Sequence, residues 1–204
     1  MQKKISEKVI NRLTLYHCIL TDYIAKNIEY ISSKQLATLL KVDDSQVRKD
    51  ISILNNSGKS NVGYIVKELK VSIERTLGFA KNKKAFIIGA GNLGSALAKY
   101  DNFQDYGLNI LALFDNDKNK IGGTVNAKPI LDIRKLENLA KKSNVDIAIL
   151  TVPRIYAQNT AEYLIKANIK YIWNFTPTVL DVPPDVQVWN ENIMGNFLQF
   201  TYNI

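Results

Sequence analysis

The sequence predicts an α/β protein with two domains and a separate terminal helix. Three observations lead to this prediction. Apolar residues in the first eighty positions mostly follow helical spacing. The stretch "AFIIGAGNLGSAL", residues 85–97, runs from an apolar strand through a glycine-rich turn into a helix, and strand and helix patterns alternate after it, which favours a doubly wound parallel sheet. We expect the domain boundaries to divide the chain into residues 1–80, 81–190 and 191–204.

Composition and charge narrow the class of protein. The 204 residues are 46% hydrophobic, which is enough to bury a sizeable core, and the sequence predicts neither a membrane span nor a signal peptide, so we expect a cytoplasmic protein without a membrane partner. The single cysteine, Cys18, and single histidine, His17, exclude an intramolecular disulfide and a cysteine-rich metal site, and their apolar helical setting favours packing. Of the net charge of +8, residues 1–78 carry 13 Lys/Arg against 8 Asp/Glu, which suits a polyanion such as DNA.

The first domain is predicted to begin with three helices. Apolar residues recur every three or four positions over residues 5–28, which indicates a long helix with one buried face. Two capping-box spacings then predict the starts of two short helices, at Ser32 with Gln35 and at Asp43 with Gln46. On the third helix, Val47, Ile51 and Leu54 follow the helical period and are expected to face inward.

The second and third helices are joined by a tight turn, and the third presents a polar and basic outer face, as a helix-turn-helix does when its second helix enters a major groove. The stretch "NNSGKSNVGYIV" predicts a wing, and a closing helix is expected to stop at Gly78. These features predict a winged-helix domain; the alternative is a packing or dimerisation module with solvated basic residues. The predicted DNA-binding residues are Ser45, Gln46, Arg48, Lys49, Ser52, Lys59 and Tyr64.

The glycine-rich turn of the second domain has the spacing of a dinucleotide site. Gly89 permits the tight turn, Gly91 lets a pyrophosphate approach the backbone, and Gly94 lets the next helix pack against the sheet. The second strand ends at Asp115, 21 residues after Gly94, where an acid accepts hydrogen bonds from a ribose 2′-hydroxyl. Because this acid repels a 2′-phosphate and the next residue, Asn116, is not an arginine, NAD(H) is favoured over NADP(H).

The alternation continues with a helix from Asp132, the strand "VDIAILTV", a helix over residues 155–167 and the strand "IKYIWNF". This pattern predicts a Rossmann-type domain with its ligand at the carboxyl ends of the strands. Two such ends, "TVPR" and "NFTP", are expected to line the nicotinamide half of the pocket, with ordinary strand-to-helix turns as an equal alternative. The residues singled out there are Thr151, Pro153 and Asn174.

The chain ends in an apolar helical stripe formed by Ile193, Phe197, Phe200 and Ile204. So apolar a helix needs cover, from its own domain or from a partner subunit, and we favour domain swapping in a dimer. The sequence contains no Ser/His/Asp set and no metal-ligand cluster, so we expect a binding protein and not an enzyme. Two alternatives stay open: an NAD-dependent oxidoreductase with an N-terminal interaction domain, and a DNA-binding regulator whose Rossmann domain is structural or binds another adenine nucleotide.

Over nearly its full length the chain resembles the Rex family of redox-sensing transcriptional repressors. The shared strings are "RL..Y", "ISSKQLA", "QVRKD", "GK...GY", "GAGNLGSAL", "FD.D..KIG", "AILTVP", "AQ" and "NFTP..L.VP". The resemblance implies a homodimer that binds a palindromic operator, NADH and NAD+ in competition, and an exchanged C-terminal helix. It places Arg48 and Lys49 on the DNA-reading helix, Asp115 at the adenosine ribose and Tyr100 near the nicotinamide. It places the pyrophosphate at Gly89, Ala90, Gly91, Asn92, Leu93 and Gly94.

The sequence departs from the family pattern at two places. Cys18 and Asn192 stand where the family usually has an arginine and an aspartate that are thought to pair during the switch. In the wing, Ser60 and Asn61 replace the usual Arg and Gly, which removes one expected DNA contact. We therefore expect an NAD(H)-responsive repressor whose redox response is weakened or rewired.

Overall fold

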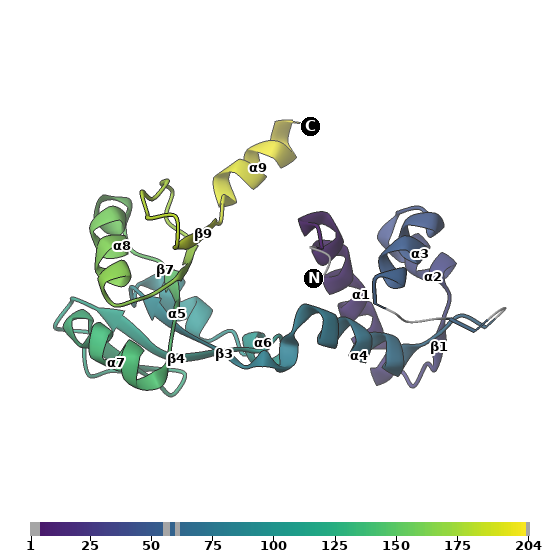
Figure 1. Cartoon of the computed structure of the whole chain (residues 1–204), viewed down its shortest axis with the longest axis horizontal. Coiled ribbons are helices and arrows are strands. Elements are labelled where there is room, and N and C mark those ends of the chain that lie inside the picture. The colour runs from purple at the N-terminus through teal and green to yellow at the C-terminus, as the bar shows by residue number, and fades with distance from the viewer. Residues whose placement is uncertain (1–4, 55–57, 60–61, 203–204) are drawn as a thin grey trace. The chain divides into compact units, whose positions relative to one another are not determined.

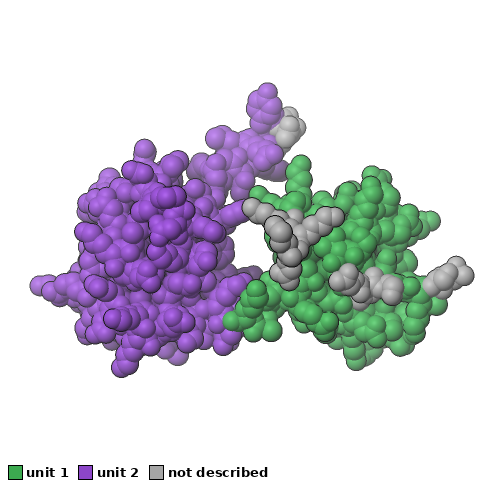
Figure 2. Space-filling model, in the orientation of Figure 1, with its two compact units in different colours: residues 1–81 green, residues 82–204 purple. Residues whose placement is uncertain are grey.

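A computed structural model describes residues 5–54, 58–59 and 62–202 of the chain. The chain divides into two compact units, Met1–Lys81 and Asn82–Ile204, coloured separately in Figure 2. Within the described part, none of the helices is both long and apolar enough to cross a membrane.

Unit 1 is helical, with one small sheet (Figure 1). Its elements are α1 (Glu7–Ala25), β1 (Tyr30–Ile31), α2 (Ser33–Leu40), α3 (Asp44–Ser52), β2 (Tyr64–Ile65) and α4 (Val66–Leu77). The expected helix-turn-helix corresponds to α2 and α3. The wing strand β2 pairs antiparallel with β1, a two-residue strand that helical periodicity alone does not predict. At the wing, Lys59 bridges to Gly63, while Ser60 and Asn61 lie outside the described residues.

The helices of unit 1 pack around one apolar core. As the periodicity predicts, Val47, Ile51 and Leu54 are buried. They lie with side chains from the other helices and β1, namely Leu13, Tyr16, Leu20, Ile31, Leu36, Ala37, Val66, Leu69 and Ile73. α4 ends at Leu77 and is capped, as expected, by Gly78, which takes the left-handed conformation with φ of 76° that an L side chain rarely adopts. The core therefore holds α3 by one face and leaves the opposite face exposed.

The two predicted capping boxes have different outcomes. At α2, the Ser32 hydroxyl accepts from the Gln35 amide at 3.1 Å, and the Gln35 side chain accepts from the Ser32 amide at 2.8 Å, so this box is confirmed. At α3, the Asp43 side chain makes no capping hydrogen bond, and Gln46 donates instead to Asp50 at 2.9 Å. The second capping box is wrong because Asp50, a buried carboxylate one turn on, takes up the Gln46 amide.

Unit 2 is a sheet covered by helices (Figure 1). Its main elements are β3 (Lys83–Ile88), α5 (Asn92–Ala98), α6 (Asn102–Asp105), β4 (Leu108–Asp115), β5 (Thr124–Val125), β6 (Lys128–Asp132), α7 (Leu136–Ser143), β7 (Ile147–Leu150), α8 (Ala157–Lys166), β8 (Tyr171–Asn174), β9 (Gln187–Asn190) and α9 (Ile193–Tyr202). The strands described lie in the order β5-β6-β4-β3-β7-β8-β9, parallel except for the β5–β6 hairpin.

Alternate residues of the strands face the two sides of this sheet. Phe86 and Ile88 pack with α7 and α8, whereas Ile87 packs with the α5 and α6 side. Three short strands, β5, β6 and β9, are additional to the predicted pattern. The helix expected from Asp132 begins only at Leu136, after β6 and a 3₁₀ turn at Ile133–Lys135, because Lys128–Asp132 pairs with β4.

The terminal helix α9 stands away from the sheet of its unit (Figure 1). None of its described residues is buried, and 53% of Phe197 and 67% of Phe200 is exposed. Ile193, also exposed, belongs to the same predicted stripe, whereas Ile204 lies outside the described residues. The sheet of unit 2 therefore does not cover the predicted apolar stripe of α9.

Candidate functional site

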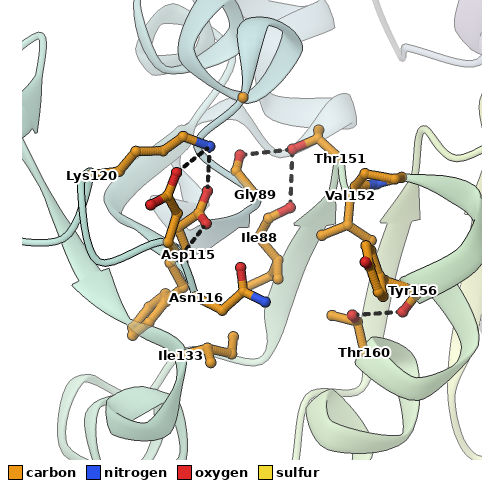
Figure 3. Close-up of a pocket in the computed structure, with 14 residues that line it drawn as sticks. Ile88, Gly89, Asp115, Asn116, Lys120, Ile133, Thr151, Val152, Tyr156 and Thr160 are labelled. Carbon is orange, nitrogen blue, oxygen red and sulfur yellow. Dashed lines mark hydrogen bonds and ion pairs between the residues drawn. The ribbon is translucent and has the colours of Figure 1, made fainter.

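A cavity of about 550 Å³ opens at the carboxyl ends of β3, β4 and β7 (Figure 3). From β3 the chain builds the sheet outward through β4 and β6, and then returns to the other side of β3 as β7. Parallel sheets bind ligands at such a reversal, because the loops from the two halves diverge there and leave a crevice. The cavity is therefore where the strand pattern predicts a ligand.

The glycine turn forms the floor of the cavity. Gly89 has φ of 102°, and a Cβ there would lie 3.0 Å from the Thr151 carbonyl oxygen. A Cβ on Gly94 would collide with the Gly89 carbonyl oxygen, so α5 packs closely on the turn only because residue 94 is glycine. A Cβ on Gly91 would meet nothing within 4 Å, which leaves open space at the position expected for the pyrophosphate.

Thr151 ties the glycine turn to the neighbouring strand. Its hydroxyl lies 3.0 Å from the carbonyl oxygens of both Ile88 and Gly89, and Figure 3 shows both interactions as dashed lines. The amide of Thr151 also donates to Ile88. Thr151, the residue directly after β7, thus holds the backbone of the turn.

Asp115 lies at the end of β4 on one wall of the cavity. Its carboxylate accepts hydrogen bonds from the Ala90 amide at 2.8 Å and the Asp117 amide at 2.9 Å, and the Lys120 ammonium lies 3.3 Å away. Burial alone would raise the pKa of Asp115, but these hydrogen bonds and the Lys120 charge outweigh it and lower that pKa. Asp115 is therefore a preorganised anionic acceptor, with 9% of its side chain exposed.

The structure brings five of the predicted cofactor-binding residues to the cavity, namely Gly89, Gly91, Asp115, Thr151 and Pro153. The lining also includes residues outside the predicted set, namely Ile88, Phe114, Asn116, Asp117, Lys120, Ile133, Val152, Tyr156 and Thr160. Lys120 belongs to the string "FD.D..KIG", so its place in a motif shared with the family could have indicated that it lies at the site. Ile133 and Tyr156 sit in 3₁₀ turns, which carry no such periodic signal.

Other predicted residues lie near the turn or apart from the cavity lining. Ala90 reaches Asp115 through its amide, and Asn92, Leu93 and Gly94 form the first turn of α5. Tyr100 is 55% exposed and packs edge-on against Phe103. Asn174 is buried at the end of β8, where its side chain bonds to Thr176 and Asn190. Their roles toward a cofactor stay predictions.

The outward face of α3 is polar and basic. Ser45, Arg48, Lys49 and Ser52 are exposed, and Arg48 pairs with Asp44 one turn earlier at 2.6 Å. Gln46 is half-buried and bonded to Asp50. In the wing, Lys59 is exposed and Tyr64 is half-buried.

Asp50 fixes α3 to α1 from the opposite face. The guanidinium of Arg12 donates to the two carboxylate oxygens of Asp50 at 2.6 and 2.9 Å, and the Tyr16 hydroxyl donates at 2.9 Å. Burial raises the pKa of Tyr16, and its bond to Asp50 adds to this effect. Arg12 and Tyr16 thus hold α3 to α1 on the side opposite its outward face.

Next to Tyr16 on α1, His17 is buried and bonded to Glu74 of α4 at 2.9 Å, in agreement with a packing role. Cys18 is exposed, so packing does not describe its side chain. In the described residues, no group of three or more His, Cys, Asp and Glu side chains is arranged to hold a metal ion.

Both units match known families, and solved structures match nearly the whole chain. Residues 4–52 match the family described as "Putative DNA-binding protein N-terminus", and residues 80–178 match the family described as "CoA binding domain". The crystal structure of RSP in complex with β-NAD+ and operator DNA matches with a TM-score of 0.90 and 35% identity, covering 98% of this chain and 93% of that one. RSP in complex with β-NADH matches with a TM-score of 0.86 at the same identity, covering 98% of this chain and 94% of that one.

A helix-turn-helix unit with a basic face, followed by a sheet with a nucleotide-type glycine turn, defines a ligand-responsive DNA-binding regulator. The redox-sensing transcriptional repressor Rex of Treponema denticola is 43% identical over 196 residues, which are 96% of this chain and 93% of that protein. The chain belongs to the Rex family of redox-sensing transcriptional repressors. Because the relatives are repressors, the predicted choice of a regulator over an oxidoreductase is confirmed.

Proposed function

We propose that this chain is a homodimeric cytoplasmic repressor that binds a palindromic operator through α3 and the wing, and that responds to NADH and NAD+ bound in the cavity of unit 2. The proposal rests on membership of the Rex family and on the two sites described above. RSP, a Rex-family repressor, has been crystallised with NAD+ and operator DNA and with NADH.

The observation that carries the cofactor assignment is Asp115 beside the glycine turn. A ribose diol donates two hydrogen bonds, and an ionised carboxylate at the end of the second strand is the acceptor suited to it. Its charge disfavours a 2′-phosphate, which supports NAD(H) over NADP(H). The open space beside Gly91 accommodates the pyrophosphate. The cavity thus supports an adenine dinucleotide better than a structural role for the sheet domain.

The DNA assignment rests on the exposed face of α3. Arg48 and Lys49 can meet phosphates or guanine edges from a helix in the major groove. A palindromic site requires two such helices related by a two-fold axis, and a symmetric dimer supplies them. The exposed apolar face of α9 is the surface that such a dimer would cover, by exchange of this helix between subunits.

The redox response is expected to be weaker than in relatives that carry the charged pair. Cys18 and Asn192 cannot form an ion pair, so they cannot favour one dimer arrangement through charge. A ligand shifts operator affinity only by its preference for one arrangement, and a hundredfold change requires about 2.7 kcal/mol. Loss of an ion pair between the arrangements would remove part of that free energy.

The direct test measures binding of the full chain to a palindromic probe by fluorescence anisotropy at fixed salt, with NADH, NAD+ or ATP. We expect NADH to weaken operator binding and NAD+ to maintain it, with a smaller ratio than in a relative that has the Arg and Asp. Release as sharp as in that relative would refute the weakened response. A response to ATP but not to NADH would overturn the cofactor assignment, and turnover of an alcohol or carbonyl substrate without DNA binding would indicate an oxidoreductase.

The same assay tests the DNA-facing helix. Lys49→Ala should weaken operator binding about tenfold and lower the salt slope by about two, one for each subunit of the dimer, if Lys49 meets a phosphate, or relax base preference if it meets a guanine edge. Lys141→Ala is the matched control, because Lys141 is an exposed lysine on α7 of the other unit. Equal behaviour of the two variants would remove Lys49 from the interface.

A further inference from the structure

A row of aromatic rings crosses unit 2 on the α5 and α6 side of the sheet. Tyr100 packs edge-on against Phe103 with ring centroids 5.1 Å apart, and Phe103 packs edge-on against Trp173 of β8 at 5.9 Å. Trp173 in turn contacts Phe175 at 5.1 Å. Because α5 starts at the glycine turn and Tyr100 follows its end, the row runs from the end of that helix to β8, which lies next to the edge strand β9.

Trp173 also makes a polar contact at the root of α9. Its indole nitrogen donates to a carboxylate oxygen of Glu191 at 2.7 Å. The Glu191 amide donates to the carbonyl of Asn174 at 2.8 Å, which continues the β8–β9 pairing by one residue. Glu191 is therefore attached to β8 by both its backbone and its side chain.

The terminal helix begins immediately after this attachment. Asn192 accepts the Gly195 amide on its side chain at 2.8 Å and the Asn196 amide on its carbonyl at 2.9 Å, so the first turn of α9 is formed directly beyond Glu191. The helix itself has no buried residue among those described. Its direction relative to the sheet is consequently set at Glu191 and Asn192, and not by side-chain packing along the helix.

We propose that Trp173 and Glu191 form a latch that sets the direction in which α9 leaves the sheet and couples α9 to the cavity through the row Tyr100, Phe103 and Trp173. The inference deepens the proposed function and rests on it. Glu191 is the one acidic residue among positions 186–204, and it directly precedes Asn192, after which α9 begins. The Glu191 carboxylate, directly before α9, is thus bonded to the Trp173 indole of the same unit.

The charge and geometry make this bond specific. An indole N–H is a donor with one direction and no acceptor, so it binds Glu191 at one ring orientation. That ring contacts both Phe103 and Phe175, so a displacement of the row changes the geometry of the bond. Trp173 and Glu191 are therefore assigned as positioning residues, because neither lines the cavity.

The test compares five variants of the full chain: Glu191→Ala, Glu191→Gln, Trp173→Phe, the double variant Glu191→Ala with Trp173→Phe, and Trp189→Phe. Glu191→Gln keeps an acceptor oxygen, and Trp173→Phe keeps a ring but loses the N–H. Trp189→Phe is the matched control on the neighbouring strand, where the indole is 54% exposed. The readout is the ratio of operator affinities with NAD+ and with NADH.

We expect Glu191→Ala and Trp173→Phe each to lower this ratio about fivefold, a coupling of the usual size for allosteric sites, and the double variant to lower it no further. Glu191→Gln and Trp189→Phe should stay near the wild-type ratio. A purely structural role would lower both operator affinities together and leave the ratio unchanged. An unchanged ratio, additive losses in the double variant, or an equal loss in Trp189→Phe would overturn the latch.

A second readout separates the latch from the proposed function. Amide hydrogen exchange at Glu191, Gly195 and Asn196 should accelerate in Glu191→Ala and Trp173→Phe, but not in Trp189→Phe. If the wild-type protein shows no NADH effect on DNA, the proposed function fails, and exchange alone decides whether the latch holds the helix root. Unchanged exchange in both variants would then refute the latch.

Discussion

Two carboxylates, one in each unit, have a pKa below the usual value, but different kinds of hydrogen-bond partner lower it. Asp50 of α3 is 1% exposed and is bonded by the side chains of Arg12, Tyr16 and Gln46. Asp115 of β4 is bonded by two backbone amides and by Lys120, and it faces a cavity. For both, burial acts to raise the pKa and the hydrogen bonds outweigh it.

The difference separates a structural charge from a binding charge. The partners of Asp50 are side chains from two helices, so the bonds fasten α3 to α1 and leave nothing for a ligand. The partners of Asp115 are mostly backbone amides of its own turn and of the glycine turn, so they fix the carboxylate without closing the cavity. A lowered pKa alone would not distinguish these roles, whereas the origin of the partners does.

The largest expected effect is on the structural charge. Asp50→Asn should destabilise unit 1 by about 3 kcal/mol, because it removes the charge that compensates the partly buried Arg12. Urea unfolding followed by circular dichroism measures this loss. Asp44→Asn is the control, since its pair with Arg48 is more exposed and should contribute less than about 1 kcal/mol. Equal losses in the two variants would mean that Asp50 does not anchor α3.

Replacing Asp115, the binding charge, should instead change the affinity for the ligand. Asp115→Asn should weaken NADH binding by ten- to a hundredfold, about 1.4 to 2.7 kcal/mol, because a ribose diol loses its ionised acceptor. Isothermal titration calorimetry with NADH and NADPH measures this change, and discrimination against NADPH should decrease. Asp132→Asn, at the end of β6 and absent from the cavity lining, serves as control. Unchanged NADH affinity in Asp115→Asn would remove Asp115 from the site.

Lowering the pH gives a further test of the structural role of Asp50. Since the pKa of Asp50 is lowered from 3.8 on folding, its stabilisation is fully present at neutral pH and is lost as the pH falls through its folded pKa. The free energy of unfolding should therefore decrease as the pH falls below about 5, and the difference in that free energy between wild type and Asp50→Asn should become smaller toward pH 3. Parallel pH profiles of the two proteins would contradict this assignment.

The smallest expected effect concerns Lys120. Its ammonium lies 3.3 Å from Asp115 and 3.8 Å from Asp117, but 39% of its side chain is exposed, so solvent weakens the interaction. Lys120→Met should change NADH affinity less than about fivefold, while discrimination against NADPH should increase because a nearby cation is lost. A larger loss of NADH affinity would show that Lys120 contacts the ligand itself.

The glycine turn and Asp115 could be predicted because their residues carry local signals. The G-x-G-x-x-G spacing and an acid at the end of the next strand are encoded within thirty residues, and the steric roles of Gly89 and Gly94 follow from backbone geometry. The contribution of Tyr156 and Thr160 depends on where α8 begins relative to β7, which no short pattern encodes. The strands β5, β6 and β9 are two to five residues long, too short for a periodic signal.

By itself the sequence determined the alternation of the main helices and strands, the glycine turn, the acid at residue 115 and the apolar stripe of the last helix, because each depends on neighbours one or two turns away. Only the tertiary structure decided that Gln46 bonds to Asp50 instead of capping its helix, and that Trp173 holds Glu191. Arg12 and Asp50 are 38 residues apart, and Trp173 and Glu191 are 18 apart. Such partners meet only after the core has packed, since burial and not local spacing brings them together.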